Sequence, residues 1–129
     1  MSPEAEDYLA MARDDLAEAA GIAGIGLHRA AARSACYAAF HAAEAFIHAR
    51  TGRVAKTHAG VRSLFALLAR RETDIAHDLP GVLARAYEFK EHADYRTAKM
   101  ADVSAAQAET QITAARRFVG EVTRVLAVS

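Results

Sequence analysis

The chain has 129 residues, 53% of them hydrophobic, and its 16 basic and 16 acidic residues cancel to a formal charge of zero. This length suits a single domain over residues 1–129, and the hydrophobic share excludes a disordered chain. A net charge of zero also excludes a global field that attracts nucleic acid, so such a role would need a local basic patch.

Cysteine content and the composition of the first residues indicate the cellular compartment. The single Cys36 cannot form an intramolecular disulfide, which fits a reducing compartment. The start "MSPEAEDYLA" lacks a basic region followed by an apolar run, and no apolar stretch reaches the length of a membrane span. We therefore expect a cytoplasmic protein without membrane contact. Only 2 prolines and 7 glycines interrupt the sequence, which favours an all-α fold.

The first two helices have clear end signals. Ser2 and Pro3 read as an N-cap followed by proline in the first turn, and the first helix should end near the glycine-rich "GIAGIGL". A second helix is expected over residues 28–50, ending at Thr51 and Gly52. The basic "TGRVAK" then reads as a loop.

Three further helices follow. Thr57 is the expected N-cap of a helix through "GVRSLFALLARR", and "ETDIAHDLPG" is a break with Pro80 just inside the next helix, "GVLARAYEFKEHADY". A polar loop, "RTAKMADV", leads to Ser104, which forms a capping-box pattern with Gln107 at the start of the last helix. Five amphipathic helices with short connections predict an up-and-down bundle of four to five helices.

The second helix carries one narrow row of polar side chains. At about 100° per residue, these residues fall within about 40° of Tyr37, whereas the rest of the helix is apolar and rich in alanine. Such a helix is central in a bundle, because its small residues let neighbours approach closely. The row, here named the polar stripe, is either a solvent-facing strip or an internal network or cleft that fixes the bundle or its dimer. Its members are Arg33, Tyr37, His41, Glu44 and His48.

A metal site on the polar stripe is disfavoured. His41, Glu44 and His48 stand at i, i+3 and i+7, and all three are possible ligands. Seven residues correspond to about 10 Å of helical rise, too far for one ion to join the two histidines. No second Glu-x-x-His appears in the sequence, so we expect no metal and no other cofactor.

A second constellation lies in the fourth helix. Arg85 and His92 are seven residues apart and differ by about 20° around the helix, with Arg96 continuing the row. An arginine can hold a phosphate and a histidine can move a proton, so the two could cleave RNA without a metal. The same spacing equally suits an exposed pair without a chemical role.

Four segments, taken together and in order, resemble the HEPN domains of small bacterial and archaeal proteins. They are "RSACYAAFHAAEAF", "KTHAGVRSLF", "RAYEFKEHADY" and "VSAAQAETQITAARRFV". The resemblance covers nearly the whole chain. It implies a bundle of four to five helices, usually a homodimer. It also implies a role beside a minimal nucleotidyltransferase, in a toxin–antitoxin or nucleotide-handling pair. The active relatives are metal-independent ribonucleases with an Arg and a His separated by a short spacer.

The ribonuclease pattern occurs twice in this chain. Arg85-x6-His92 and Arg53-x4-His58 both match it, and position favours Arg85 and His92 because Arg53 falls in a predicted loop. Ala86 replaces the polar residue that active toxins commonly place directly after the Arg.

Three interpretations follow from the resemblance. The first is a nucleotide- or RNA-binding member of a pair with a minimal nucleotidyltransferase. The second is an active ribonuclease toxin, in which His92 is the general acid and base, Arg85 holds the phosphate, and Tyr95, Arg96 and Lys90 bind RNA. The third is a non-catalytic oligomeric helical scaffold.

Overall fold

The computed structural model describes residues 1–95 and 102–128, which form five α-helices and, within those ranges, no strand. The predicted all-α bundle is therefore confirmed. Residues 96–101, including Arg96 and most of the predicted polar loop, lie outside the described residues. The helices are α1 (Pro3–Gly24), α2 (His28–Thr51), α3 (His58–Arg70), α4 (Leu79–Asp94) and α5 (Ala105–Ala127).

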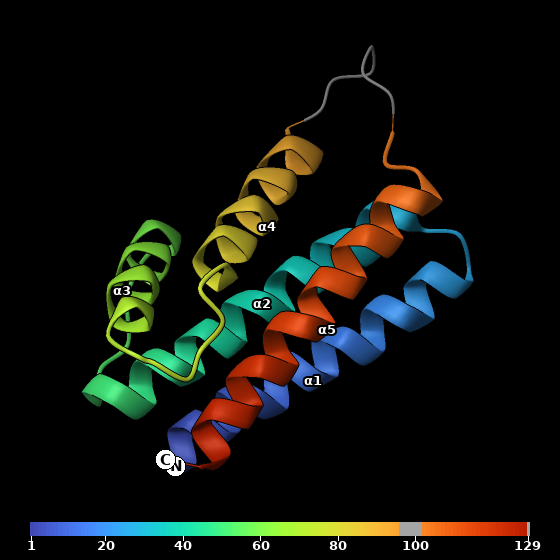
Figure 1. The fold of residues 1–129 in the computed structure, drawn as a ribbon. Coiled ribbons are helices and arrows are strands. Elements are labelled where there is room, and N and C mark those ends of the chain that lie inside the picture. Colours follow the sequence, from blue (N-terminus) through green and yellow to red (C-terminus); the bar gives the residue numbers. More distant parts are fainter. Residues whose placement is uncertain (96–101, 129) are drawn as a thin grey trace.

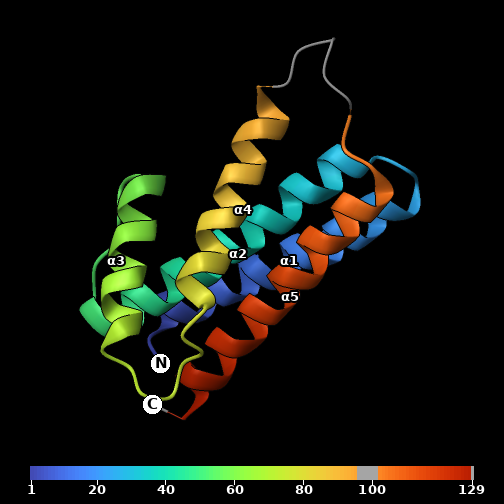
Figure 2. The same ribbon diagram turned by 45° about the horizontal axis from the view of Figure 1, so that its top comes forward.

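Helices α1, α2 and α5 lie side by side, and α3 and α4 cover the far side of α2 (Figures 1 and 2). The short turn after α1 makes α1 and α2 antiparallel neighbours. Helix α2 contacts all four other helices, as its nearly continuous apolar circumference predicts. No helix of the described residues is long and apolar enough to span a membrane.

Alanine explains how α2 reaches four neighbours at once. Eight of its ten alanines are buried, and the absence of longer side chains allows close helix packing. Phe46 of α2, Phe65 of α3 and Phe118 of α5 form the central aromatic contacts, with ring centroids 5.3 Å and 5.1 Å apart. These contacts hold α2 between α3 and α5, and so they also position the polar stripe on α2.

The helix ends confirm the predicted start and stop signals. Thr57 Oγ1 accepts a hydrogen bond from the Gly60 amide at 2.9 Å. Ser104 and Gln107 form the reciprocal capping box, at 3.1 Å and 2.9 Å. Gly52 ends α2 with a φ of 69°, a left-handed conformation that glycine adopts without steric cost.

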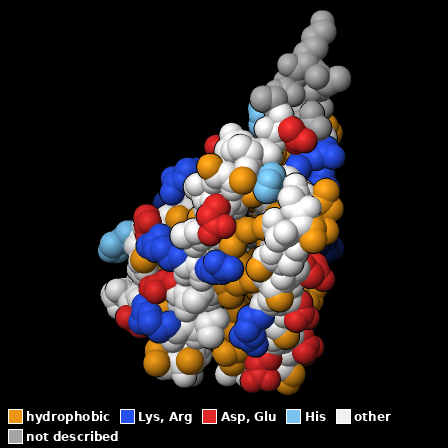
Figure 3. Space-filling model, turned by 90° about the vertical axis from the view of Figure 1, so that its right-hand side faces the viewer, with side chains coloured by type: hydrophobic (Ala, Val, Ile, Leu, Met, Phe, Trp, Pro, Cys, Tyr) orange, Lys and Arg blue, Asp and Glu red, His pale blue; other side chains and the backbone are white. Residues whose placement is uncertain are grey.

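Charged side chains of both signs are mixed on the face shown in Figure 3, where they flank a band of hydrophobic side chains. This face has no extended basic surface, in keeping with the zero formal charge of the chain.

Candidate functional site at the junction of α2, α3 and α4

Four aromatic rings meet where α2, α3 and α4 come together. Tyr37 and Phe40 come from α2, His58 from the first turn of α3, and Tyr87 from α4. His58 stacks on Phe40 with centroids 4.7 Å apart, and Tyr87 contacts both of these rings edge-to-face at 5.8 Å. Tyr37 contacts His58 edge-to-face at 6.3 Å. We call these four residues the aromatic cluster.

Two cationic side chains lie over the rings of the cluster. The Arg62 guanidinium lies 3.9 Å from the centroid of Tyr87, and the Lys90 ammonium lies 5.3 Å from that of Tyr37. Both distances are within the range of cation–π attraction. The Nε atom of Arg62 is buried and has no hydrogen-bond partner among the described residues. The nearby Glu91 carboxylate raises the pKa of the Tyr87 phenol.

Asp94 connects Lys90 to Arg33 of α2. Its carboxylate accepts from Arg33 Nε at 2.7 Å and from Lys90 Nζ at 2.6 Å. Burial opposes ionisation of Asp94, but the hydrogen bonds from Lys90 and Arg33 outweigh it and lower the pKa of the carboxyl. The same bond to Asp94 raises the pKa of Lys90, which is only 8% exposed. The three side chains therefore form a charged network that joins α2 to α4.

The other polar-stripe residues have partners on α1, although the His41 ring also stacks on Tyr37 with centroids 6.4 Å apart. His41 Nδ1 lies 2.5 Å from Asp15 Oδ2, and His48 Nδ1 lies 3.1 Å from Ser2 Oγ. Burial raises the pKa of Glu44, although the nearby His41 opposes this. The stripe thus divides, with Arg33 and Tyr37 facing α4 and α3, and the rest facing α1.

The predicted catalytic pair lies on the outer side of α4. Arg85 and His92 are exposed, and no hydrogen bond joins them to each other or to another described side chain. The guanidinium of Arg85 lies beside Gly81. Tyr95 is 77% exposed at the end of the helix. Of the two predicted RNA-binding residues that the structure describes, Lys90 and Tyr95, only Lys90 is part of the aromatic–cationic junction.

Arg62 and Tyr87 of this junction were missed from the sequence, and His58 was considered only as half of the Arg53-x4-His58 pattern. His58 and Arg62 are one turn apart at the start of α3, inside the segment "KTHAGVRSLF". That spacing, in a segment that carries the family resemblance, is the signal that could have found them. Arg53, the other half of the second ribonuclease pattern, is exposed in the loop before α3.

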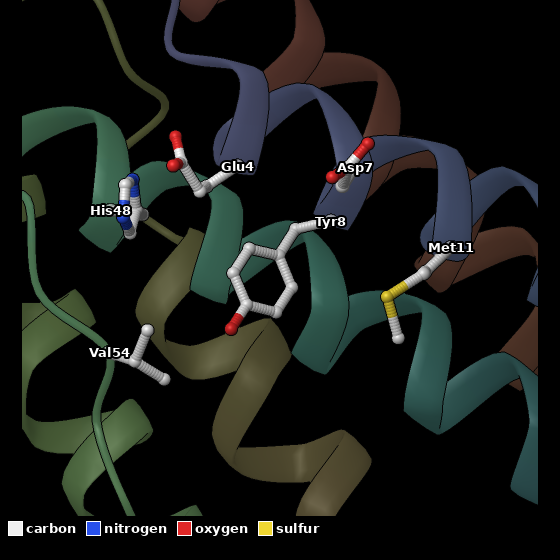
Figure 4. Close-up of a pocket in the computed structure, with 6 residues that line it drawn as sticks. All are labelled: Glu4, Asp7, Tyr8, Met11, His48 and Val54. Carbon is white, nitrogen blue, oxygen red and sulfur yellow. The ribbon is translucent and has the colours of Figure 1, made fainter.

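A separate pocket of about 390 Å³ lies between α1, the end of α2 and the following loop. Figure 4 shows the Tyr8 ring at its centre, between His48 and Met11, with Glu4 and Asp7 on the α1 side. Among the described residues, two carboxylates and no Lys or Arg line this pocket, so it is unsuited to a phosphate. The junction of α2, α3 and α4 is the better candidate for an anionic ligand. No group of three or more His, Cys, Asp or Glu side chains within the described ranges could hold a metal ion.

The fold and the junction define a class: a small helical bundle with a cationic and aromatic site on its central helix. The model of the HEPN domain matches residues 5–125, and the chain belongs to the HEPN domain family. Among solved structures, it is similar to TT1696 from Thermus thermophilus, with 26% sequence identity and a TM-score of 0.80. That match covers 95% of this chain and 98% of TT1696. No curated protein matches the chain.

Proposed function

We propose that this HEPN protein binds nucleotide or RNA at the junction of α2, α3 and α4. It acts as one member of a toxin–antitoxin or nucleotide-handling pair with a minimal nucleotidyltransferase. One observation supports this most. Three of the four segments that resemble HEPN domains each contribute cationic or aromatic side chains to that single place. The paired partner and the homodimer are implied by the family.

The local charge of the junction favours an anion, although the net charge of the chain is zero. Arg33, Lys90 and Arg62 supply three cations, and Asp94 and Glu91 supply two anions, which leaves one positive charge at the junction. Arg62 forms no ion pair with a described carboxylate, and its planar guanidinium, held against Tyr87, is suited to a phosphate. A phosphate at Arg62 would place the attached sugar and base close to the aromatic cluster.

Calorimetry tests the binding half of this proposal. The probes are a nucleoside monophosphate and a short single-stranded RNA, titrated at low salt because phosphate contacts weaken as salt rises. Arg62→Met should weaken binding about tenfold or more, the scale expected for a hydrogen bond to a charged group. Arg70→Met is the matched control, since Arg70 is exposed near the end of the same helix and bonds to its own backbone. Equal binding by both variants would contradict the site.

Co-purification tests the partner half. The chain, expressed together with a minimal nucleotidyltransferase from the same genome, should elute with it as one complex, and alone it should elute as a homodimer. Light scattering gives both masses. Separate elution of the two proteins would contradict the pairing, and a monomer would contradict the dimer.

A metal-independent ribonuclease is the second candidate function. The observation that favours it is the exposure of Arg85 and His92 on one side of α4, with both side chains open to an RNA strand. Induced expression should then arrest growth, and His92→Ala should abolish the arrest while His77→Ala does not. Equal toxicity of both variants would exclude His92 as the proton-transfer group.

A further inference from the structure

His58 has an unusual position within the aromatic cluster. It stacks on the buried Phe40 with 23° between the ring planes, yet His58 itself is exposed. Tyr37 and Tyr87 contact it edge-to-face, at interplanar angles of 73° and 85°. Phe40 covers one face of the imidazole, so a planar group that stacks on His58 has only the opposite face available. The three neighbouring rings fix the orientation of the imidazole.

The other rings of the cluster offer no comparable surface. Arg62 covers a face of Tyr87, Lys90 lies over Tyr37, and Phe40 is only 2% exposed. His58 is thus the single exposed ring of the four. One exposed ring provides a stacking platform for one planar group and not for a series of them.

Arg62, whose Nε lacks a hydrogen-bond partner among the described residues, lies next to the His58 ring. Arg62 follows His58 by one turn of α3, so the two side chains project from the same side of the helix. Both also contact the ring of Tyr87. The buried Nε of Arg62 has no hydrogen-bond partner in the described part of the chain, and a buried donor without a partner is costly. A phosphate bound to the terminal nitrogens of Arg62 would supply acceptors to this guanidinium.

We propose that His58 and Arg62 form a site for one unpaired nucleotide unit, in which the base stacks on the open face of His58 and the phosphate binds Arg62. This inference rests on the proposed function and specifies its ligand. The nucleotide unit is either a free mononucleotide or a single unstacked residue of an RNA strand. Base–aromatic stacking tolerates any base, because every base has a π-face.

The experiment compares four probes by calorimetry on the full-length protein. They are adenosine monophosphate, ribose 5-phosphate, a short single-stranded oligoadenylate, and the same oligonucleotide paired with its complement. The monophosphate should bind at least about fivefold more tightly than ribose 5-phosphate, the lower end of what stacking contributes per base. The duplex should bind more weakly than the single strand, because its bases are already stacked. Equal affinity for monophosphate and ribose phosphate would overturn the proposal.

The affinities for the monophosphate and for the single strand show whether the site takes a free mononucleotide or one residue of an RNA strand. Binding of free monophosphate as tightly as the single strand identifies a mononucleotide site. Tighter binding of the single strand identifies an RNA site that reads one base. Both results support the proposal, and a duplex that binds as tightly as the single strand overturns it.

Substitutions at His58 separate stacking from hydrogen bonding. His58→Phe keeps a flat ring on Phe40 and should retain monophosphate binding within about threefold, whereas His58→Ala should lose at least about fivefold. His77→Ala, at another exposed histidine, is the matched control and should bind as the unsubstituted protein does. Circular dichroism melting of each variant checks the fold. Loss of binding in His58→Phe as large as in His58→Ala would overturn the stacking role.

The proposed function and this inference fail in different ways. If Arg62→Met weakens binding but His58→Ala does not, the nucleotide site stands and the stacking platform is wrong. If no probe binds the unsubstituted protein, both are wrong. If an aromatic, acidic peptide from the nucleotidyltransferase binds at this site and no nucleotide does, the proposed pairing stands. The nucleotide site is then wrong, and the junction is a protein interface.

Discussion

Lys90 and Asp94 form an ion pair at 2.6 Å, one turn apart on α4, in a setting where Lys90 is nearly enclosed by protein. A buried ammonium without a counter-ion is strongly unfavourable. The ion pair with Asp94 therefore stabilises the buried ammonium of Lys90 at its position over the ring of Tyr37.

Replacement of Asp94 tests how far the fold depends on this pair. Asp94→Asn should lower the free energy of unfolding by about 1–3 kcal/mol, because Lys90 and Arg33 lose their shared anion. Urea denaturation gives the value. Asp78→Asn is the matched control, since its pair with Arg117 is exposed and should contribute little. A loss in Asp94→Asn no larger than in the control would show that the network is not structural.

Because the pKa of Asp94 is lowered, the loss of stability in Asp94→Asn should depend on pH. A carboxyl with a lower pKa in the folded protein stabilises it above the unfolded pKa, near about 3.9 for Asp, and less as pH falls further. The difference in melting temperature between the unsubstituted protein and Asp94→Asn should be constant from pH 7 to about pH 5 and shrink below about pH 4. Thermal melts across that range test this. A difference that persists unchanged to pH 3 would contradict it.

The pH dependence of stability at Glu44 should have the opposite sign to that at Asp94. Burial raises its pKa, so the folded state favours the protonated acid, and its stabilising contribution is lost as pH rises through the folded pKa. Glu44→Gln should then be more stable than the unsubstituted protein at pH 7, by less than about 1 kcal/mol because the carboxylate is only half-buried. The advantage should vanish below about pH 4. Glu18→Gln, at an exposed position of α1, should show no such trend.

Two glycines with similar space around them should respond in opposite directions to alanine. No atom lies within 4 Å of a Cβ added at Gly52 or Gly120, so steric contact does not distinguish them. Gly52→Ala should destabilise by about 1–2 kcal/mol, because its φ of 69° is unfavourable for an L-residue. Gly120→Ala, inside α5, should stabilise by about 0.5–1 kcal/mol. Chemical denaturation measures both, and a change of the same sign at the two positions would contradict the argument.

The helices could be predicted because their signals are local. The caps at Ser2, Thr57 and Ser104, and the stop at Gly52, depend on residues within one turn. The central place of α2 also followed from its own composition. Capping and stop signals together with composition therefore predicted the five helices and the central place of α2 among them.

The candidate site could not be predicted in the same way, because its contacts join residues far apart in the chain. Arg33 and Asp94 are 61 residues apart, and a helical wheel shows which side a residue faces but not which helix lies opposite. For that reason the polar stripe looked continuous, although His41 pairs with Asp15 of α1 and Arg33 with Asp94 of α4. The proposed catalytic role of Arg85 and His92 stays a prediction.

The contact of α2 with all four other helices bears on how the protein opens. Any partial unfolding that exposes the amides of α2 must first remove one of its neighbours, and each neighbour buries part of the same alanine-rich surface. In hydrogen exchange, the central amides of α2 should therefore exchange only through global unfolding, while those of α3 can exchange through local opening. A ligand bound to His58 and Arg62 of α3 would then slow exchange in α3 first, so the exchange rates of this outer helix report binding.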